Sequence, residues 1–110
     1  MHVAVVDPGQ VVVLDGRLDV RALPDVRDAL QAAVDAGAGD LVLDVARLEL
    51  RDAAGLGLLV GLHRRALVQG RRLVLANPPP RLARQLRIAR LSRVLAVVES
   101  GGASAAPALV

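Results

Sequence analysis

Short apolar strands alternate with segments of helical periodicity along most of this 110-residue chain. Leu41-Val42-Leu43 and Leu73-Val74-Leu75 are continuous apolar runs of the kind that is buried inside a parallel sheet. Residues 22–37 and 53–70 instead repeat apolar side chains at helical spacing and end at glycines. This alternation predicts an α/β fold with right-handed crossovers and a largely parallel β-sheet.

The two ends of the chain add further elements to that sheet. Two valine-rich runs, residues 3–6 and 11–14, flank the turn sequence Asp7-Pro8-Gly9-Gln10. We expect these runs to pair as an N-terminal hairpin, which makes the sheet mixed. A third helix is expected to begin at the prolines that follow Asn77, and residues 94–98 are a candidate last strand.

The chain length allows one domain with a single core. Residues 1–99 are interpreted as this domain, and residues 100–110, which lack periodicity, as a disordered tail. Because aromatic residues are absent, the core must consist of Leu, Val and Ala. No apolar run approaches the roughly 18–20 residues of a membrane span, and the N-terminus does not resemble a secretory signal. We therefore expect a cytoplasmic protein without membrane insertion.

The residue types argue against catalysis and against a metal or cofactor site. The chain has no Cys and only two His, His2 and His63, which are far apart in the sequence. Ser92, the only Ser before the tail, has no neighbouring His motif that would make it a nucleophile. The glycines form no phosphate-binding loop. We expect neither enzyme activity nor a bound cofactor.

All fourteen basic side chains are arginine, and the formal net charge is only +3. Arginines recur every third residue from position 81 to position 93, so on a helix they drift around the axis and do not form one stripe. Without aromatic residues for base stacking, this pattern does not favour nucleic acid binding. A solvated helix surface, open to contact with an acidic partner, is the better interpretation.

The tetrapeptide Asp52-Ala53-Ala54-Gly55 is the strongest candidate functional site. It follows a strand that is expected to end near Val45, and it opens the helix expected over residues 53–68. Asp52 is a good N-cap, because its carboxylate can accept hydrogen bonds from first-turn N–H groups. A helix N-terminus also carries unpaired N–H groups and the positive end of the helix dipole, so it accepts anions readily.

Residues 43–60, which contain this tetrapeptide and the following Leu56-Gly57-Leu58-Leu59, resemble the central signature of the STAS domain family. That family is named after sulfate transporters and anti-sigma factor antagonists. The early strand, the later strand with its turn, and the last helix of the family resemble, in that order, residues 11–19, 71–78 and 82–91. The Thr-Gly pair often found in the last helix is replaced by Ala89-Arg90. The resemblance covers nearly the whole chain and implies the family's mixed α/β fold.

In the antagonists of this family, two hydroxyl residues commonly follow the Asp, and the partner kinase phosphorylates the second. Both positions are alanine in this chain, Ala53 and Ala54. The chain has no Thr or Tyr, and its Ser residues lie outside the loop, at positions 92, 100 and 104. By the resemblance, the unmodified form binds the partner. The sequence therefore predicts a protein that cannot be switched off by phosphorylation of this loop.

By the same resemblance, the loop and its surroundings contact the protein partner. The predicted partner-binding residues are Asp19, Asp52, Gly55, Leu58 and Leu62. Asp19 has an alternative role as the cap of the turn that follows it. Leu58 and Leu62 are candidates for an exposed apolar contact, or for cover by the third helix or the tail. The opposite face of the same helix, expected to pack on the sheet, carries Leu56, Val60, His63 and Leu67.

Other residues near the loop carry weaker predictions. Gly57 and Gly61 lie four residues apart, which predicts either close packing on the sheet or the close approach of another backbone or of a partner. His63 is expected to be packed, with a backbone hydrogen-bond partner. Glu49 and Arg51 flank the loop and are expected to shape its electrostatics.

Two functions fit these observations. The first is a protein-binding regulator that resembles an anti-sigma factor antagonist and binds an anti-sigma factor of the ATPase-kinase type. We expect the regulator to be a monomer or weak dimer. The alternative is an accessory STAS subunit of a transport or other multiprotein complex, which needs no phosphorylation. The single-domain length and the Leu-Gly-Leu-Leu pattern favour the first function. The two alanines weaken this preference, because an accessory subunit needs no phosphorylatable residue.

Overall fold

The computed structural model describes residues 1–99, which form one five-stranded sheet with three α-helices and a short 3₁₀-helix. The strands are β1 (His2–Asp7), β2 (Val11–Leu18), β3 (Asp40–Leu50), β4 (Arg72–Ala76) and β5 (Ala96–Val98). The helices are α1 (Leu23–Ala36), α2 (Ala53–Val68), α3 (Pro80–Ile88) and the 3₁₀-helix η1 (Leu91–Arg93). The predicted tail lies outside the described residues.

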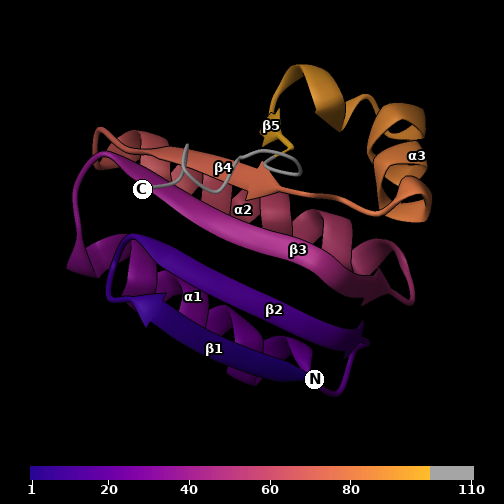
Figure 1. The fold of residues 1–110 in the computed structure, drawn as a ribbon, viewed down its shortest axis with the longest axis horizontal. Helices are drawn as coiled ribbons and strands as arrows, with labels where there is room; N and C mark the ends of the chain where they lie inside the picture. Colours follow the sequence, from indigo (N-terminus) through magenta and orange to yellow (C-terminus); the bar gives the residue numbers. More distant parts are fainter. Residues whose placement is uncertain (100–110) are drawn as a thin grey trace.

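The strand pairing confirms the predicted mixed sheet. The strand order is β1-β2-β3-β4-β5, with β1 antiparallel to β2 and all other neighbours parallel. The carboxyl ends of the parallel strands β2, β3 and β4 therefore point to the same end of the molecule, where α3 also lies (Figure 1). The hairpin of β1 and β2 is the one predicted from the turn sequence between them.

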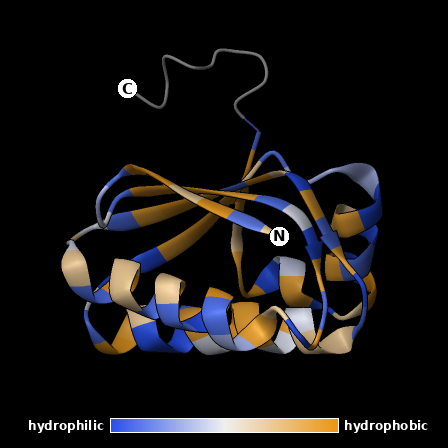
Figure 2. Ribbon diagram, turned by 90° about the horizontal axis from the view of Figure 1, so that it is seen from below, coloured by the Kyte–Doolittle hydropathy of each residue, from blue (hydrophilic) through white to orange (hydrophobic). Residues whose placement is uncertain are grey.

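The helices lie on one side of the sheet and enclose the core against it (Figure 2). The largest side chains that are fully buried are all leucines, contributed by strands and helices alike. This confirms the prediction, from the lack of aromatic residues, that aliphatic side chains build the core. Within residues 1–99, no helix is both long enough and apolar enough to cross a membrane.

Strand β3 is longer than predicted and ends at Leu50, not near Val45. The reason is its neighbour, because β2 continues in parallel register until Leu18 lies opposite Leu50. One extra β3 residue is accommodated where the register shifts near Val13, and the Ala46 N–H there donates to Asp44 Oδ1 at 3.1 Å. Beyond this irregularity, Leu48 and Leu50 are buried, while Arg47 is exposed and Glu49 half-buried. That alternation is typical of a strand with one face on the core.

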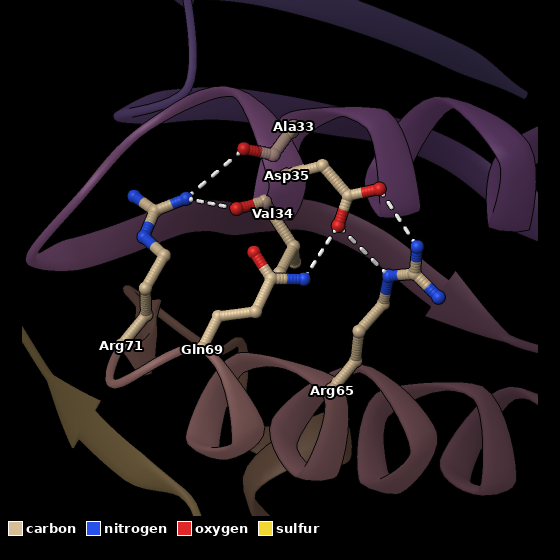
Figure 3. Close-up of polar contacts among 6 residues, drawn as sticks. All are labelled: Ala33, Val34, Asp35, Arg65, Gln69 and Arg71. Carbon is tan, nitrogen blue, oxygen red and sulfur yellow. Dashed lines mark hydrogen bonds and ion pairs between the residues drawn. The ribbon is translucent and has the colours of Figure 1, made fainter.

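A buried arginine closes the C-terminal end of α1. Arg71 is only 3% exposed, and its guanidinium donates to the carbonyl oxygens of Ala33 at 3.0 Å and Val34 at 2.8 Å (Figure 3). It also donates to Gly39 O at 3.0 Å and to the carbonyl of Gly9 in the β1–β2 turn. The last carbonyls of a helix have no partner within the helix. Arg71 supplies these donors and ties the α1 terminus to the hairpin.

An exposed ion pair joins α1 to α2 beside this point. The carboxylate of Asp35 accepts from Arg65 Nη2 at 2.7 Å and Nε at 3.0 Å, and from Gln69 Nε2 at 2.6 Å (Figure 3). The hydrogen bonds from Arg65, followed by the one from Gln69, lower the pKa of Asp35 from 3.8 to about 2.

Because of the ion pair between Asp35 and Arg65, we expect the free energy of unfolding to fall as the pH drops from about 4 to about 2. The pKa of Asp35 is lower in the folded chain than in the unfolded chain, so its contribution is complete above the unfolded pKa and is lost on protonation. Urea unfolding midpoints at several pH values, for wild type and Asp35→Asn, measure this contribution. Parallel pH curves for the two proteins would contradict the assignment.

Candidate functional site

The Asp52 loop, residues 51–55, consists of the connection between β3 and α2 and the first residues of α2. Asp52 has an extended backbone, and its Oδ1 accepts from the Ala54 N–H at 2.9 Å. Its carbonyl oxygen also accepts from the Gly55 N–H at 3.3 Å. The helix runs from Ala53 to Val68, which confirms both the predicted bounds and the predicted N-cap. Asp52, Ala53 and Ala54 are all exposed.

Gly55 has a role inside the fold. It is buried, and a Cβ atom at this position would lie 2.7 Å from Leu50 Cδ2 and 3.5 Å from Leu18 Cδ2. The missing side chain lets the first turn of α2 sit closely on the ends of β2 and β3. Since Gly55 is buried, it offers no open surface to the predicted partner.

Asp19 lies next to the Asp52 loop. It follows β2, and its Oδ1 accepts from the backbone N–H groups of Arg21 at 3.0 Å and Ala22 at 3.1 Å, which caps the turn into α1. The backbone links the two segments directly, because the Arg51 N–H donates to Leu18 O at 3.0 Å. The structure therefore brings the predicted site residues Asp19 and Asp52 to the same edge of the sheet, and both are exposed.

The prediction that Leu58 and Leu62 form an exposed apolar pair is wrong. Leu58 is 6% exposed and Leu62 2%, and both belong to the core cluster. The predicted burial of the opposite helix face is also wrong at Leu67. This side chain was expected to pack on the sheet, but it is 56% exposed. The cause is that α2 packs against both the sheet and α1. A helix buried on two sides needs a wider apolar face than a helix that rests on a sheet alone.

A groove of about 290 Å³ lies between α1 and α2 and reaches Ala54. Its lining consists of Leu23, Arg27, Gln31, Ala54, Gly57, Leu58, Gly61 and Leu62. Gly57 and Gly61 are exposed, and a Cβ atom at either position would meet no other atom within 4 Å. Of the two alternatives for these glycines, close packing on the sheet is thus wrong, and the approach of another backbone or of a partner stays a prediction. Their missing side chains instead leave the groove open.

Charged side chains gather around Glu49, close to the loop in the chain. Glu49 lies 3.5 Å from Arg17, 3.6 Å from Arg51 and 3.8 Å from Arg81, measured between the nearest nitrogen and carboxylate oxygen atoms. The sequence indicated Glu49 and Arg51 but not the other two. Arg17 could have been found from strand register, since it lies opposite Glu49 in the parallel pair. Arg81 comes from α3, and no local pattern places it there.

Two further expectations concern His63 and metal binding. The Nδ1 atom of His63 is buried and has no hydrogen-bond partner in the described structure, so the backbone partner expected for this side chain is not found at that nitrogen. Among residues 1–99, no group of three or more His, Cys, Asp or Glu side chains is placed to hold a metal ion.

Comparison with known families decides how this architecture is classified. A family profile described as "Mlab, STAS domain" matches residues 1–99. The chain belongs to the STAS domain family. This confirms the resemblance drawn from the residues around the Asp52 loop. A comparison with curated protein sequences gives no match.

Several solved structures share the fold of this STAS chain. It is similar to the Bacillus cell fate determinant SpoIIAA in its phosphorylated form, with 22% identity, a TM-score of 0.73, and 99% of this chain and 98% of that one covered. The unphosphorylated antagonist SpoIIAA gives 24% identity, a TM-score of 0.69, and coverage of 87% and 85%. An anti-sigma-factor antagonist (STAS) domain protein from Planctomyces limnophilus gives 18% identity, a TM-score of 0.77, and coverage of 97% and 94%. At these identities the likeness establishes the fold.

Proposed function

We propose that this STAS protein is a protein-binding regulator that binds an anti-sigma factor of the ATPase-kinase type and lacks the phosphorylatable switch of other antagonists. One observation carries the proposal. The exposed loop of a STAS fold presents Ala53 and Ala54 at the capped start of α2, the positions for which the family resemblance implies hydroxyl residues in antagonists. Asp19 and Asp52 lie exposed at the same edge, so a partner can contact both at once.

The chemistry of alanine explains why such a regulator would stay active. A phosphate adds nearly two negative charges at pH 7, and it requires a hydroxyl to receive it. An alanine methyl group provides neither the nucleophile nor the charge. Ser92 is exposed but belongs to η1, which follows α3 in the chain. Binding through the Asp52 loop would then be controlled by the abundance of the protein and not by modification of the loop.

The same alanines support a second candidate, an accessory STAS subunit of a transport or other multiprotein complex. Such a subunit docks through its fold and needs no hydroxyl in the loop. The family profile described as "Mlab, STAS domain" fits this function as well as the first. The two candidates differ in whether the partner is a kinase that reads position 54.

We expect Ala54→Ser to gain one phosphate when it is incubated with ATP and the kinase-type anti-sigma factor encoded in the same genome. The change is mild, because Ser is well tolerated near a helix N-terminus. Phosphorylation should then weaken binding about tenfold or more, since it adds charge beside Asp52. Mass spectrometry measures the modification, and calorimetric titration before and after it measures the affinity.

Wild type and Ala53→Ser are the matched controls, and both should remain unmodified in the loop. The kinase is first checked for activity on another antagonist. If an active kinase binds none of the three proteins, or binds Ala54→Ser without modifying it, the antagonist proposal is wrong and the accessory subunit is favoured.

A further inference from the structure

Three arginines from three separate elements surround one carboxylate beside the Asp52 loop. Arg17 comes from β2, Arg51 from the loop and Arg81 from α3, and all three face Glu49 near the end of β3. We call these four residues the Glu49 patch. Their side chains are 70% (Arg17), 49% (Arg51), 74% (Arg81) and 35% (Glu49) exposed, so the patch is open to solvent and carries a net charge of about +2.

The arginines of this patch lie farther from their carboxylate oxygens than Arg65 and Arg72 do from theirs. Arg65 and Arg72 each contact a carboxylate of their own through two nitrogens, with distances of 2.7–3.1 Å. The three nitrogens nearest Glu49 are 3.5–3.8 Å away, beyond the roughly 2.7–2.9 Å of a strong charge-assisted bond. One carboxylate cannot satisfy three guanidinium groups, each with five N–H donors. The patch therefore keeps free donors for further carboxylates.

An apolar cavity adjoins the patch. It measures about 200 Å³ and lies between the end of β3 and the start of α3. Its lining residues are Leu48, Glu49, Leu50, Pro79, Arg81, Leu82 and Gln85. The volume falls below the roughly 300–1,000 Å³ of small-molecule sites, and the leucines supply an aliphatic floor. It suits one aliphatic side chain of a partner more than a whole cofactor.

We propose that the Glu49 patch binds an acidic protein segment that places an aliphatic side chain in this cavity and flanking carboxylates on Arg17 and Arg81. The inference rests on the proposed function, because Arg51 directly precedes Asp52 and a partner seated on the loop covers both. Nucleic acid suits the surface less well. The chain has no aromatic residue for base stacking.

The test uses the full-length ¹⁵N-labelled protein and the peptide acetyl-Glu-Asp-Leu-Asp-Glu-amide. Amide chemical-shift changes should concentrate at residues 48–51 and 81–85 and weaken as salt is added. Arg81→Glu should lower peptide affinity about tenfold or more, because it reverses one of the contact charges. Arg87→Glu is the matched control. It makes the same charge change at another exposed arginine of α3, outside the patch and the cavity lining, and should leave the affinity unchanged. Replacing the peptide Leu with Ala should weaken binding several-fold.

Several results would overturn the inference. Equal weakening by Arg81→Glu and Arg87→Glu would mean that only net charge matters. Tighter binding of single-stranded DNA or of anionic lipid vesicles than of the peptide would assign the patch to another class of ligand. Peptide binding without any binding of an anti-sigma factor would instead refute the proposed function and leave the chemistry of the patch intact. Anti-sigma factor binding that is unaffected by Arg81→Glu would refute the inference alone.

Discussion

Replacing Arg71 with methionine is expected to lower the free energy of unfolding by about 3–5 kcal/mol. Methionine keeps most of the aliphatic chain but has no donor, so the buried carbonyl oxygens of Ala33, Val34 and Gly9 lose the hydrogen bonds from Arg71. Each buried carbonyl left without a hydrogen bond costs roughly 1–3 kcal/mol. Because Arg71 is 3% exposed, water has little access to replace the missing donors. Urea unfolding, followed by circular dichroism, measures the loss.

The neighbouring arginine is the matched control for this experiment. Arg72 is exposed and pairs only with the exposed carboxylate of Asp40, so Arg72→Met should cost far less than Arg71→Met. Arg71→Lys should lie between the two, because a lysine retains the charge but cannot present a planar fork of donors to several carbonyls. Equal losses for Arg71→Met and Arg72→Met would show that Arg71 is not the group that holds the end of α1.

The different environments of Arg71 and Arg72 could not be predicted from the sequence. Arg71 directly precedes β4 and Arg72 is its first residue, and nothing in their local sequence distinguishes the two arginines. Only the packed structure does, because Arg71 turns toward the ends of α1 and the hairpin while Arg72 turns to solvent. An interaction between residues more than thirty positions apart leaves no periodic trace in the sequence.

Elements that depend on local chemistry were predicted well. The bounds of α2 follow from the cap at Asp52 and the break at Gly70, which both act within one turn of the helix. The hairpin follows from its Asp-Pro-Gly turn. The end of β3 was missed, because its last residues are held in the sheet by β2 and not by their own pattern.

In the candidate site, too, some residues could be placed from the sequence and others could not. Asp19 and Asp52 follow two strands that were predicted to belong to one largely parallel sheet, and the structure places them at one edge. The roles of the leucines in α2 could not be derived, because apolar residues occur on nearly all sides of this helix. Which of them are buried depends on how closely α1 approaches, and that is a property of the packed domain.

Replacing Leu62 with glutamate is expected to unfold the protein at neutral pH and room temperature. The change removes a fully buried leucine, which costs about 2–5 kcal/mol of stability. It also buries a carboxylate without a partner, which costs roughly several kcal/mol more. The sum is comparable to the roughly 5–15 kcal/mol that stabilises a typical domain. Leu58→Glu should act in the same direction but less strongly, because Leu58 is 6% exposed and lines the open groove.

Leu67→Glu is the control, because it makes the same substitution on the same helix at a side chain that is 56% exposed. It should change the free energy of unfolding by no more than about 0.5 kcal/mol. Thermal unfolding followed by circular dichroism distinguishes the two outcomes. A folded Leu62→Glu protein beside an unfolded Leu67→Glu protein would reverse the assignment of the helix faces. If the expected result holds, loss of partner binding in Leu58→Glu or Leu62→Glu reports lost folding, and the partner surface must be tested through exposed residues such as Asp19, Asp52 and Arg81.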